Sequence, residues 1–238
     1  MKSLRHAILL TALALIATPC LVAAEEHDAI KPVPRQGGWM TRHQSFNKRV
    51  AEGNVDIVFI GDSITQGWEG GGKEVWAKFY GKRNAVNLGI GGDRTQHVIW
   101  RLDHDNVKNI SPKAAVVMIG TNNSGSNTPE QIAEGVAAIV KQLRTKLPKT
   151  QVLLLAVFPR GPDKNDKRRQ VNEKTNEIFK KLADGKIVHY LDIGPKFLQD
   201  DGTLTREIMP DLLHLSKKGY TIWAESIEPT LKTLMGEK

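Results

Sequence analysis

Four short blocks of the sequence carry side chains suited to nucleophilic chemistry. Ser63 stands in GDSIT, directly after the apolar run VDIVFIG. A serine hydroxyl is a poor nucleophile until a base takes its proton. His214 is the candidate base, because it lies in the loop PDLLHLSKKGY, three residues after Asp211. In a loop or a single turn this spacing can bring the carboxylate to the imidazole, which it would orient and stabilise in its charged form.

The tetrad DLLH also has a plainer interpretation. Asp211 can cap a turn while His214 is an ordinary polar loop residue, and the four residues alone do not decide between the two. The other six histidines fit the role of a base less well. They lie in the N-terminal segments or inside predicted helices and strands: His6, His27, His43, His97, His104 and His189.

Two further apolar runs end in hydrogen-bond donors. Gly92, in NLGIGGD, can offer a backbone N–H where a side chain would block approach. Asn122, in IGTNN, can offer its amide N–H₂. Each residue alone also fits a turn or a helix cap, but their placement at successive strand ends favours a site that stabilises a developing oxyanion.

The glycine-rich stretch 67–73, GWEGGGK, has the spacing of a phosphate-binding loop. That motif requires a Ser or Thr after the lysine to bind magnesium, whereas Glu74 follows here. The loop should also leave its strand at once, but Gly67 comes six residues after Gly61. GIGGDR likewise lacks the last glycine of a dinucleotide fingerprint, because Arg94 occupies that position. The sequence therefore argues against nucleotide binding.

Apolar runs and helical segments alternate along the chain after residue 38. Thr128 and Pro129 suit the N-cap and first position of one helix, which Pro148 would end. Alternation of this kind predicts a three-layer α/β/α sandwich, whose sites lie beyond the carboxyl ends of the strands. The runs are nearly continuous, as parallel strands covered on both faces require: VDIVFIG, NAVNLGI, AAVVMIG, QVLLLAVF and IVHYLDI.

GDSIT, GIGGD, GTNN and DLLH, in this order, resemble the four blocks of the SGNH (GDSL-type) hydrolase superfamily. The resemblance runs from about residue 39 to the C-terminus. It implies a flavodoxin-like five-stranded parallel sheet in the order 2-1-3-4-5. It also implies a catalytic triad of Ser63, Asp211 and His214, with an oxyanion hole made by the N–H groups of Ser63 and Gly92 and the side chain of Asn122.

Within the superfamily the chain most resembles the catalytic subunits of the platelet-activating-factor acetylhydrolases, through NLGIGGDRTQHVIWRL, VVMIGTNN, FPRG and DLLHLSKKGY. This likeness implies an acyl-ester hydrolase that needs no metal or other cofactor. It further implies that Ile64, Thr121 and Leu213 crowd the acyl pocket and favour a short acyl group such as acetyl. An acetylated carbohydrate or lipid is then the expected substrate.

The first 24 residues have the pattern of a cleavable secretory signal peptide. Lys2 and Arg5 precede the apolar run AILLTALALIA, which is too short for a membrane span, and small residues lead to Ala24. We expect cleavage after Ala24, a polar N-terminal arm at 25–38 and a hydrolase domain at 39–238. Cleavage would remove Cys20, the only cysteine, and would release a secreted or periplasmic protein with no stable membrane insertion.

The composition is that of a globular protein, with 40% hydrophobic and 25% charged residues. The formal charge of +8 falls to +6 without the signal, and no aromatic residues interleave with a basic stripe, so a nucleic-acid role is disfavoured. Two other functions stay open: a non-catalytic carbohydrate-binding protein on this scaffold, and a lipase or thioesterase for longer chains. The oligomeric state is also open, with a homodimer as one option.

Overall fold

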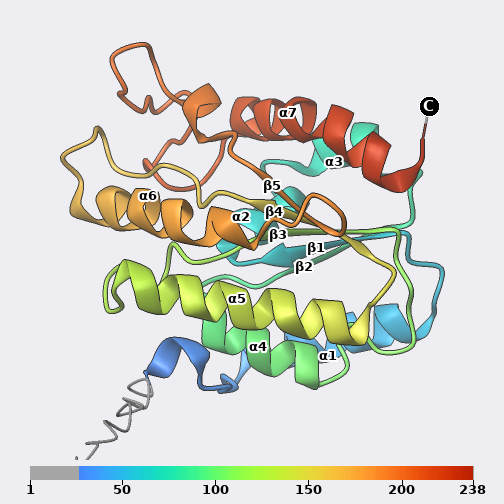
Figure 1. The fold of residues 1–238 in the computed structure, drawn as a ribbon. Helices are drawn as coiled ribbons and strands as arrows, with labels where there is room; N and C mark the ends of the chain where they lie inside the picture. Colours follow the sequence, from blue (N-terminus) through green and yellow to red (C-terminus); the bar gives the residue numbers. More distant parts are fainter. Residues whose placement is uncertain (1–26, 238) are drawn as a thin grey trace, which may run out of the picture.

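The computed structural model describes residues 27–237, so the predicted signal peptide and its cleavage site lie outside the described residues. Five parallel strands form one sheet in the order β2-β1-β3-β4-β5 (Figure 1). The predicted α/β sandwich and strand order are therefore confirmed. The strands are β1 (Ile57–Gly61), β2 (Ala85–Gly89), β3 (Ala114–Met118), β4 (Gln151–Leu155) and β5 (Val188–Leu191).

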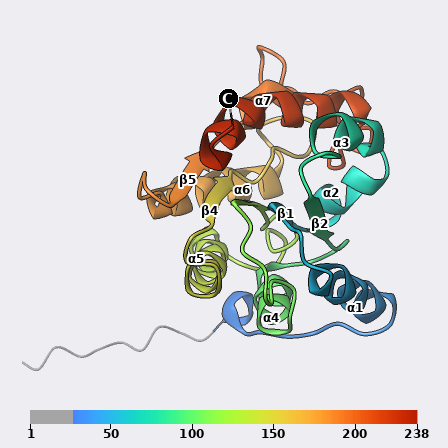
Figure 2. The same cartoon turned by 90° about the vertical axis from the view of Figure 1, so that its right-hand side faces the viewer.

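Helices cover both faces of the sheet. In Figure 2 helices α1, α4 and α5 lie on one face, and helices α3 and α7 lie on the other. Phe179 of α6 belongs to the same apolar core as α1, α4 and α5. The helices are α1 (Gly38–Ala51), α2 (Ser63–Gln66), α3 (Lys73–Phe79), α4 (Thr95–Asp103), α5 (Pro129–Lys146), α6 (Lys167–Phe179) and α7 (Lys217–Met235). No helix within residues 27–237 is both long and apolar enough to span a bilayer.

Strand β1 shows why the apolar runs are continuous. Val58 and Ile60 enter the core beneath α1, α4 and α5, whereas Ile57 and Phe59 enter the core beneath α3 and α7. Because successive side chains of a strand point to opposite faces, a strand covered on both sides must be apolar at every position. All five residues of β1 are buried. This buried strand, paired with β2 and β3, leads into the turn that carries Ser63.

The sequence pattern places the end of helix α6 too late. A helix continuing to Gly185 is expected, but α6 ends at Phe179 and a single 3₁₀ turn, Lys180–Leu182, follows it. The Asp184 carboxylate accepts the backbone N–H groups of residues 186, 187 and 188 at 2.8–2.9 Å. These bonds start β5, so the chain must leave the helix before Asp184.

Candidate active site

Ser63 begins the short helix α2 directly after β1, as its position in the sequence predicts. The preceding residue, Asp62, caps this helix, and its Oδ1 accepts the N–H of Ile64 at 2.9 Å. Tyr220 of α7 donates its hydroxyl to the Ile64 carbonyl at 2.7 Å. The turn that presents Ser63 is therefore held from both sides of its backbone.

The structure brings Ser63, His214 and Asp211 into one hydrogen-bonded row. The Ser63 Oγ lies 2.9 Å from Nε2 of His214. Nδ1 of the same ring lies 2.6 Å from Oδ2 of Asp211. Ser63 and His214 are 151 residues apart in sequence, yet the fold brings them within hydrogen-bond distance. The three side chains lie in the order that a nucleophile, a base and an orienting carboxylate require.

Asp211 also builds the turn that holds His214. Its Oδ1 accepts the backbone N–H groups of Leu213 at 3.0 Å and of His214 at 2.7 Å. Asp211 therefore caps the turn with one carboxylate oxygen and meets the imidazole with the other, so the capping role and the contact with His214 coexist. Partial burial opposes ionisation of Asp211, but these hydrogen bonds outweigh it and lower its pKa to about 2.

The ionised Asp211 sets the tautomer of the histidine. A carboxylate can only accept hydrogen bonds, so the proton of neutral His214 resides on Nδ1. Nε2 is then an acceptor and receives the Ser63 hydroxyl hydrogen across the 2.9 Å contact. In this arrangement His214 can remove the serine proton, as a general base must.

The turn Ile90–Asp93 follows β2 and presents the expected oxyanion donor Gly92. The turn is closed by the Asp93 N–H, which donates to the Ile90 carbonyl at 3.1 Å. Gly92 has a φ of 75°, a left-handed conformation that glycine adopts without strain. Within residues 27–237 neither the Gly92 N–H nor the Ser63 N–H donates to a protein acceptor, so both can serve a ligand.

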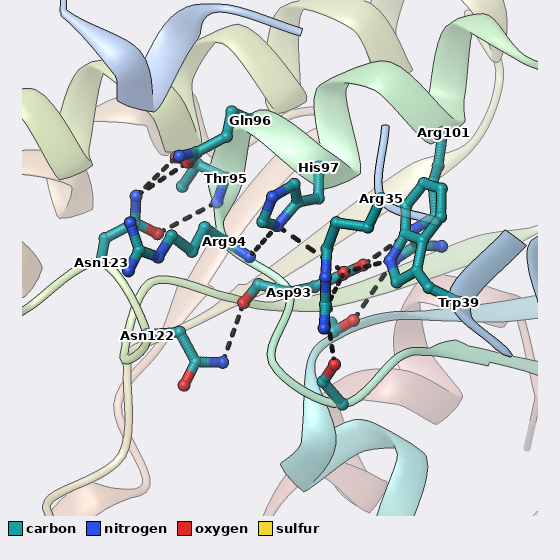
Figure 3. A network of polar contacts seen from close by, with 12 residues as sticks. Arg35, Trp39, Asp93, Arg94, Thr95, Gln96, His97, Arg101, Asn122 and Asn123 are labelled. Atoms are coloured by element: carbon teal, nitrogen blue, oxygen red, sulfur yellow. Dashed lines mark hydrogen bonds and ion pairs between the residues drawn. The ribbon is translucent and has the colours of Figure 1, made fainter. Parts of the chain in front are cut away.

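Asn122 lies beside this turn. Its Nδ2 donates to the Asp93 carbonyl at 2.9 Å (Figure 3). An amide N–H₂ has two hydrogens, and this bond uses one of them and fixes the plane of the group. The second hydrogen stays available for a ligand. The side-chain donor that the sequence predicts is therefore held in a defined orientation.

Asp93 anchors this turn through its buried side chain, a role that the sequence did not predict. Its buried carboxylate accepts Trp39 Nε1 at 2.6 Å and Arg101 Nε at 2.9 Å (Figure 3). Arg35, from the segment before α1, adds a bond to Asp93 Oδ1 at 3.3 Å and a closer one to the Gly91 carbonyl at 2.8 Å. The turn is thus clamped by side chains more than 50 residues away in sequence.

Arg35→Ala is expected to lower kcat on an aryl acetate by about tenfold, because a charge-assisted hydrogen bond to the turn is lost. KM should change by less than about twofold, since the clamp acts on the N–H donors rather than on substrate contacts. Steady-state kinetics with matched thermal unfolding tests this. Arg49→Ala is the control, because Arg49 donates to the Gly53 carbonyl at the other end of α1. Unchanged kcat in Arg35→Ala would contradict the clamp.

Asp62 combines full burial with an incomplete set of hydrogen bonds. Its Oδ2 has no partner among the described residues. Burial raises the pKa of the Asp62 carboxyl to about 7, although the Ile64 N–H opposes the shift. The serine is therefore preceded by an acid that the fold prefers to keep neutral.

Asp62→Asn is expected to raise the free energy of unfolding relative to the wild type, and by more at high pH than at low pH. The folded-state pKa of about 7 exceeds the unfolded value of about 4, so the folded protein binds the proton more tightly and wild-type stability falls across this range. An amide keeps the acceptor for Ile64 without the charge. The difference in free energy of unfolding should grow in favour of the variant by roughly 1–3 kcal/mol from pH 5 to pH 8. Urea denaturation at both pH values measures it, and a constant difference would contradict the burial argument.

The three residues expected to crowd the acyl pocket lie in helix α2, in the loop after β3 and in the DLLH turn. Ile64 is 1% exposed and Thr121 is 2% exposed, whereas Leu213 is half-buried in the DLLH turn. The Thr121 hydroxyl accepts hydrogen bonds from Arg160 and from Asn172, each at 3.2 Å. These two hydrogen bonds fix the Thr121 side chain, which would form one wall of the acyl pocket.

The glycine-rich stretch 67–72 packs tightly against α7. A Cβ on Gly67 would lie 2.0 Å from the Tyr220 hydroxyl oxygen, and one on Gly72 would lie 2.7 Å from the Trp68 ring. A cavity of about 420 Å³ lies nearby, against β2 and Trp68, but none of the residues predicted for chemistry lines it. No group of three or more metal-ligating side chains occurs among the described residues.

Comparisons with known proteins identify relatives of this chain. The GDSL-like Lipase/Acylhydrolase family model matches residues 59–222. Human platelet-activating factor acetylhydrolase IB subunit alpha1 is 38% identical over 224 residues, which cover 91% of this chain and 94% of that protein. The alpha2 subunit from Rattus norvegicus is 37% identical over 203 residues, covering 84% and 86%.

Solved structures share the fold. A GDSL-like lipase from Bacteroides thetaiotaomicron superposes with a TM-score of 0.61 at 18% identity, covering 81% of this chain and 97% of that one. An acetylxylan esterase from Geobacillus stearothermophilus gives a TM-score of 0.59 at 17% identity, covering 78% and 96%. The chain belongs to the GDSL-like lipase/acylhydrolase family and is a carboxylic-ester hydrolase.

Proposed function

We propose that the protein is a serine esterase that hydrolyses short-chain esters, above all acetyl esters, through an acyl-enzyme. The observation that carries this proposal is the row Ser63–His214–Asp211, with contacts of 2.9 and 2.6 Å. The proposed donors, Gly92 and Asn122, lie on the neighbouring strand ends. Nucleophile, base, orienting group and oxyanion donors are the full set that acyl transfer needs.

Acylation begins when Ser63 Oγ attacks the ester carbonyl carbon and His214 Nε2 takes the hydroxyl proton. The carbonyl oxygen becomes an oxyanion, which accepts hydrogen bonds from the N–H groups of Ser63 and Gly92 and from Asn122. The bond from carbon to the alcohol oxygen then breaks, and the alcohol leaves with the proton from Nε2. Water then attacks the acyl carbon and gives a proton to His214. The bond from that carbon to Ser63 Oγ breaks, the acid leaves, and Nε2 returns the proton to Ser63.

Phosphonate labelling tests the nucleophile. A serine-directed aryl phosphonate should add one phosphonyl group to the wild type, and peptide mass spectrometry should place it on Ser63. A non-catalytic carbohydrate-binding protein on this scaffold would not react. Labelling of another residue, or none at a concentration that labels a control esterase, would reject the assignment.

The preference for a short acyl group rests on the burial of Ile64 and Thr121. A pocket closed by these residues has no space for a long acyl chain, because protein interiors are close-packed and hardly compressible. We expect kcat/KM for aryl acetate to exceed that for aryl octanoate by about 100-fold or more, since forcing extra methylenes into a packed wall costs about 1–3 kcal/mol or more. Kinetics across the C2–C8 series measures this. A preference for octanoate would instead favour the longer-chain lipase or thioesterase.

The ester substrate that we favour is an acetylated carbohydrate or lipid. The side chains of His214 and Asp211 are 44% and 55% exposed, so the triad lies at an open surface that a bulky alcohol can approach. An acetylhydrolase among the relatives and an acetylxylan esterase among the structural neighbours support acetyl esters. Acetate release from a panel of acetylated glycans and lipids would identify the substrate.

We also propose that the protein is exported. Support comes from the basic start, the short apolar run and the small residues that end at Ala24. N-terminal sequencing of the mature protein after expression in a bacterial host should begin at Glu25. A retained Met1 would reject export by signal cleavage.

A further inference from the structure

Arg160 lies between the two loops that carry the proposed catalytic groups. It follows β4, and its Nη1 donates to the side-chain oxygen of Thr121 at 3.2 Å and to the Thr121 carbonyl at 3.4 Å. Its neighbour Gly161 donates its N–H to the Leu212 carbonyl at 2.9 Å. Arg160 therefore borders the Asn122 loop on one side and the DLLH turn on the other.

The charge of Arg160 has no carboxylate partner. No Asp or Glu oxygen lies within 4.0 Å of its guanidinium in the described part of the chain, and Nη1 alone makes hydrogen bonds. Nε and Nη2 are not among the buried atoms that lack partners, so they reach solvent. A half-buried guanidinium thus keeps two nitrogens with free donors at the edge of the site.

A second arginine without a counter-ion stands next to it. Arg168, the second residue of α6, is exposed and makes no ion pair within residues 27–237. Its Nη2 lies 3.1 Å from the position that a Cβ on Gly125 would occupy, so the guanidinium rests on the Thr121–Asn122 loop. Burial and the charge of Arg168 lower the pKa of Arg160, and the more weakly acting charges of Asp166, Asp62 and Asp211 oppose the shift. The two charges repel each other, and an anion placed between them would relieve that repulsion.

We propose that Arg160 and Arg168 bind an anionic group, a carboxylate or a phosphate, on the alcohol portion of the ester. Guanidinium donors match the planar pairs of oxygens that such groups present. Arg168 is exposed whereas Ile64 and Thr121 are buried, so an anion held between the two arginines lies toward the open side of the site, where the alcohol leaves. This inference rests on the proposed ester hydrolysis and names the class of its substrate.

The test compares phenyl acetates that carry a para carboxylate, phosphate or neutral carboxamide. For each enzyme the ratio of kcat/KM for an anionic ester to that for the neutral ester is measured. Arg160→Gln should lower this ratio by roughly tenfold or more, because a charge-assisted hydrogen bond at a half-buried site is lost. Arg168→Gln, which does not contact Thr121, should lower it by about two- to fivefold. The carboxylate and phosphate arms show which anion is preferred.

Lys181→Gln is the matched control, since it removes an exposed positive charge beyond the other end of α6 and should leave the ratio unchanged. If esters are hydrolysed but neither arginine variant changes the ratio, the subsite is wrong while the esterase function stands. If no ester is hydrolysed, calorimetric titration with 4-hydroxybenzoate and phenyl phosphate replaces kinetics. Equal affinity of the wild type and both arginine variants would then overturn the subsite independently of catalysis.

Discussion

Ser63→Ala is expected to lower kcat/KM for an aryl acetate by at least about 10⁴-fold, because the Ser63 hydroxyl is the nucleophile of the proposed mechanism. The Ser63 Oγ makes its contact with His214 at 2.9 Å, and the Ser63 backbone N–H would remain as an oxyanion donor. Loss of the hydroxyl should therefore remove covalent catalysis while leaving part of the binding and electrostatic contribution. Initial rates at high enzyme concentration measure the residual activity.

Two controls make the Ser63→Ala result specific. Ser45→Ala removes an exposed hydroxyl that bonds only to its own helix, at the Arg42 carbonyl, and should keep wild-type activity. Thermal unfolding of Ser63→Ala should match that of the wild type, since Asp62 and not Ser63 caps α2. Wild-type turnover in the folded Ser63→Ala protein would show that the nucleophile is elsewhere.

Three of the residues proposed for chemistry, Ser63, Gly92 and Asn122, could be found from the sequence because each follows the end of a strand. Continuous apolar runs locate parallel strands, and the site of such a sheet lies at one edge. Ser63, Gly92 and Asn122 could therefore be grouped before any coordinates were considered. The strand order itself came from the family resemblance, because alternation of elements does not specify which strands are neighbours.

The residues that hold the site were not accessible in the same way. Arg35, Asp93 and Arg101 are charged residues whose partners lie 8 to 58 positions away, and periodicity shows which face a residue occupies but not which charge it meets. Asp62 could be assigned to the turn after β1, but its complete burial could not. Arg160 belongs to the FPRG stretch on which the family resemblance rests, but the sequence does not predict its hydrogen bond to Thr121.

Asp211→Asn should reduce kcat/KM by roughly 10³- to 10⁴-fold while the turn persists. The amide oxygen of the variant can still accept the N–H groups of Leu213 and His214, which Asp211 Oδ1 accepts at 3.0 and 2.7 Å. The amide nitrogen would then face Nδ1 and donate to it. The ring proton must move to Nε2, which would point a hydrogen at Ser63 Oγ and could no longer accept one.

The tautomer is what separates this explanation from a general loss of structure. ¹⁵N chemical shifts of His214 should report protonation at Nδ1 in the wild type and at Nε2 in Asp211→Asn. Asp201→Asn is the matched control, because Asp201 accepts the Thr203 N–H at 2.9 Å in a comparable exposed turn but meets no histidine. If Asp211→Asn loses activity with the Nδ1 tautomer intact, the carboxylate acts through its charge on the imidazolium rather than through the position of the proton. If it keeps wild-type activity, His214 needs no orienting partner, and the triad assignment fails.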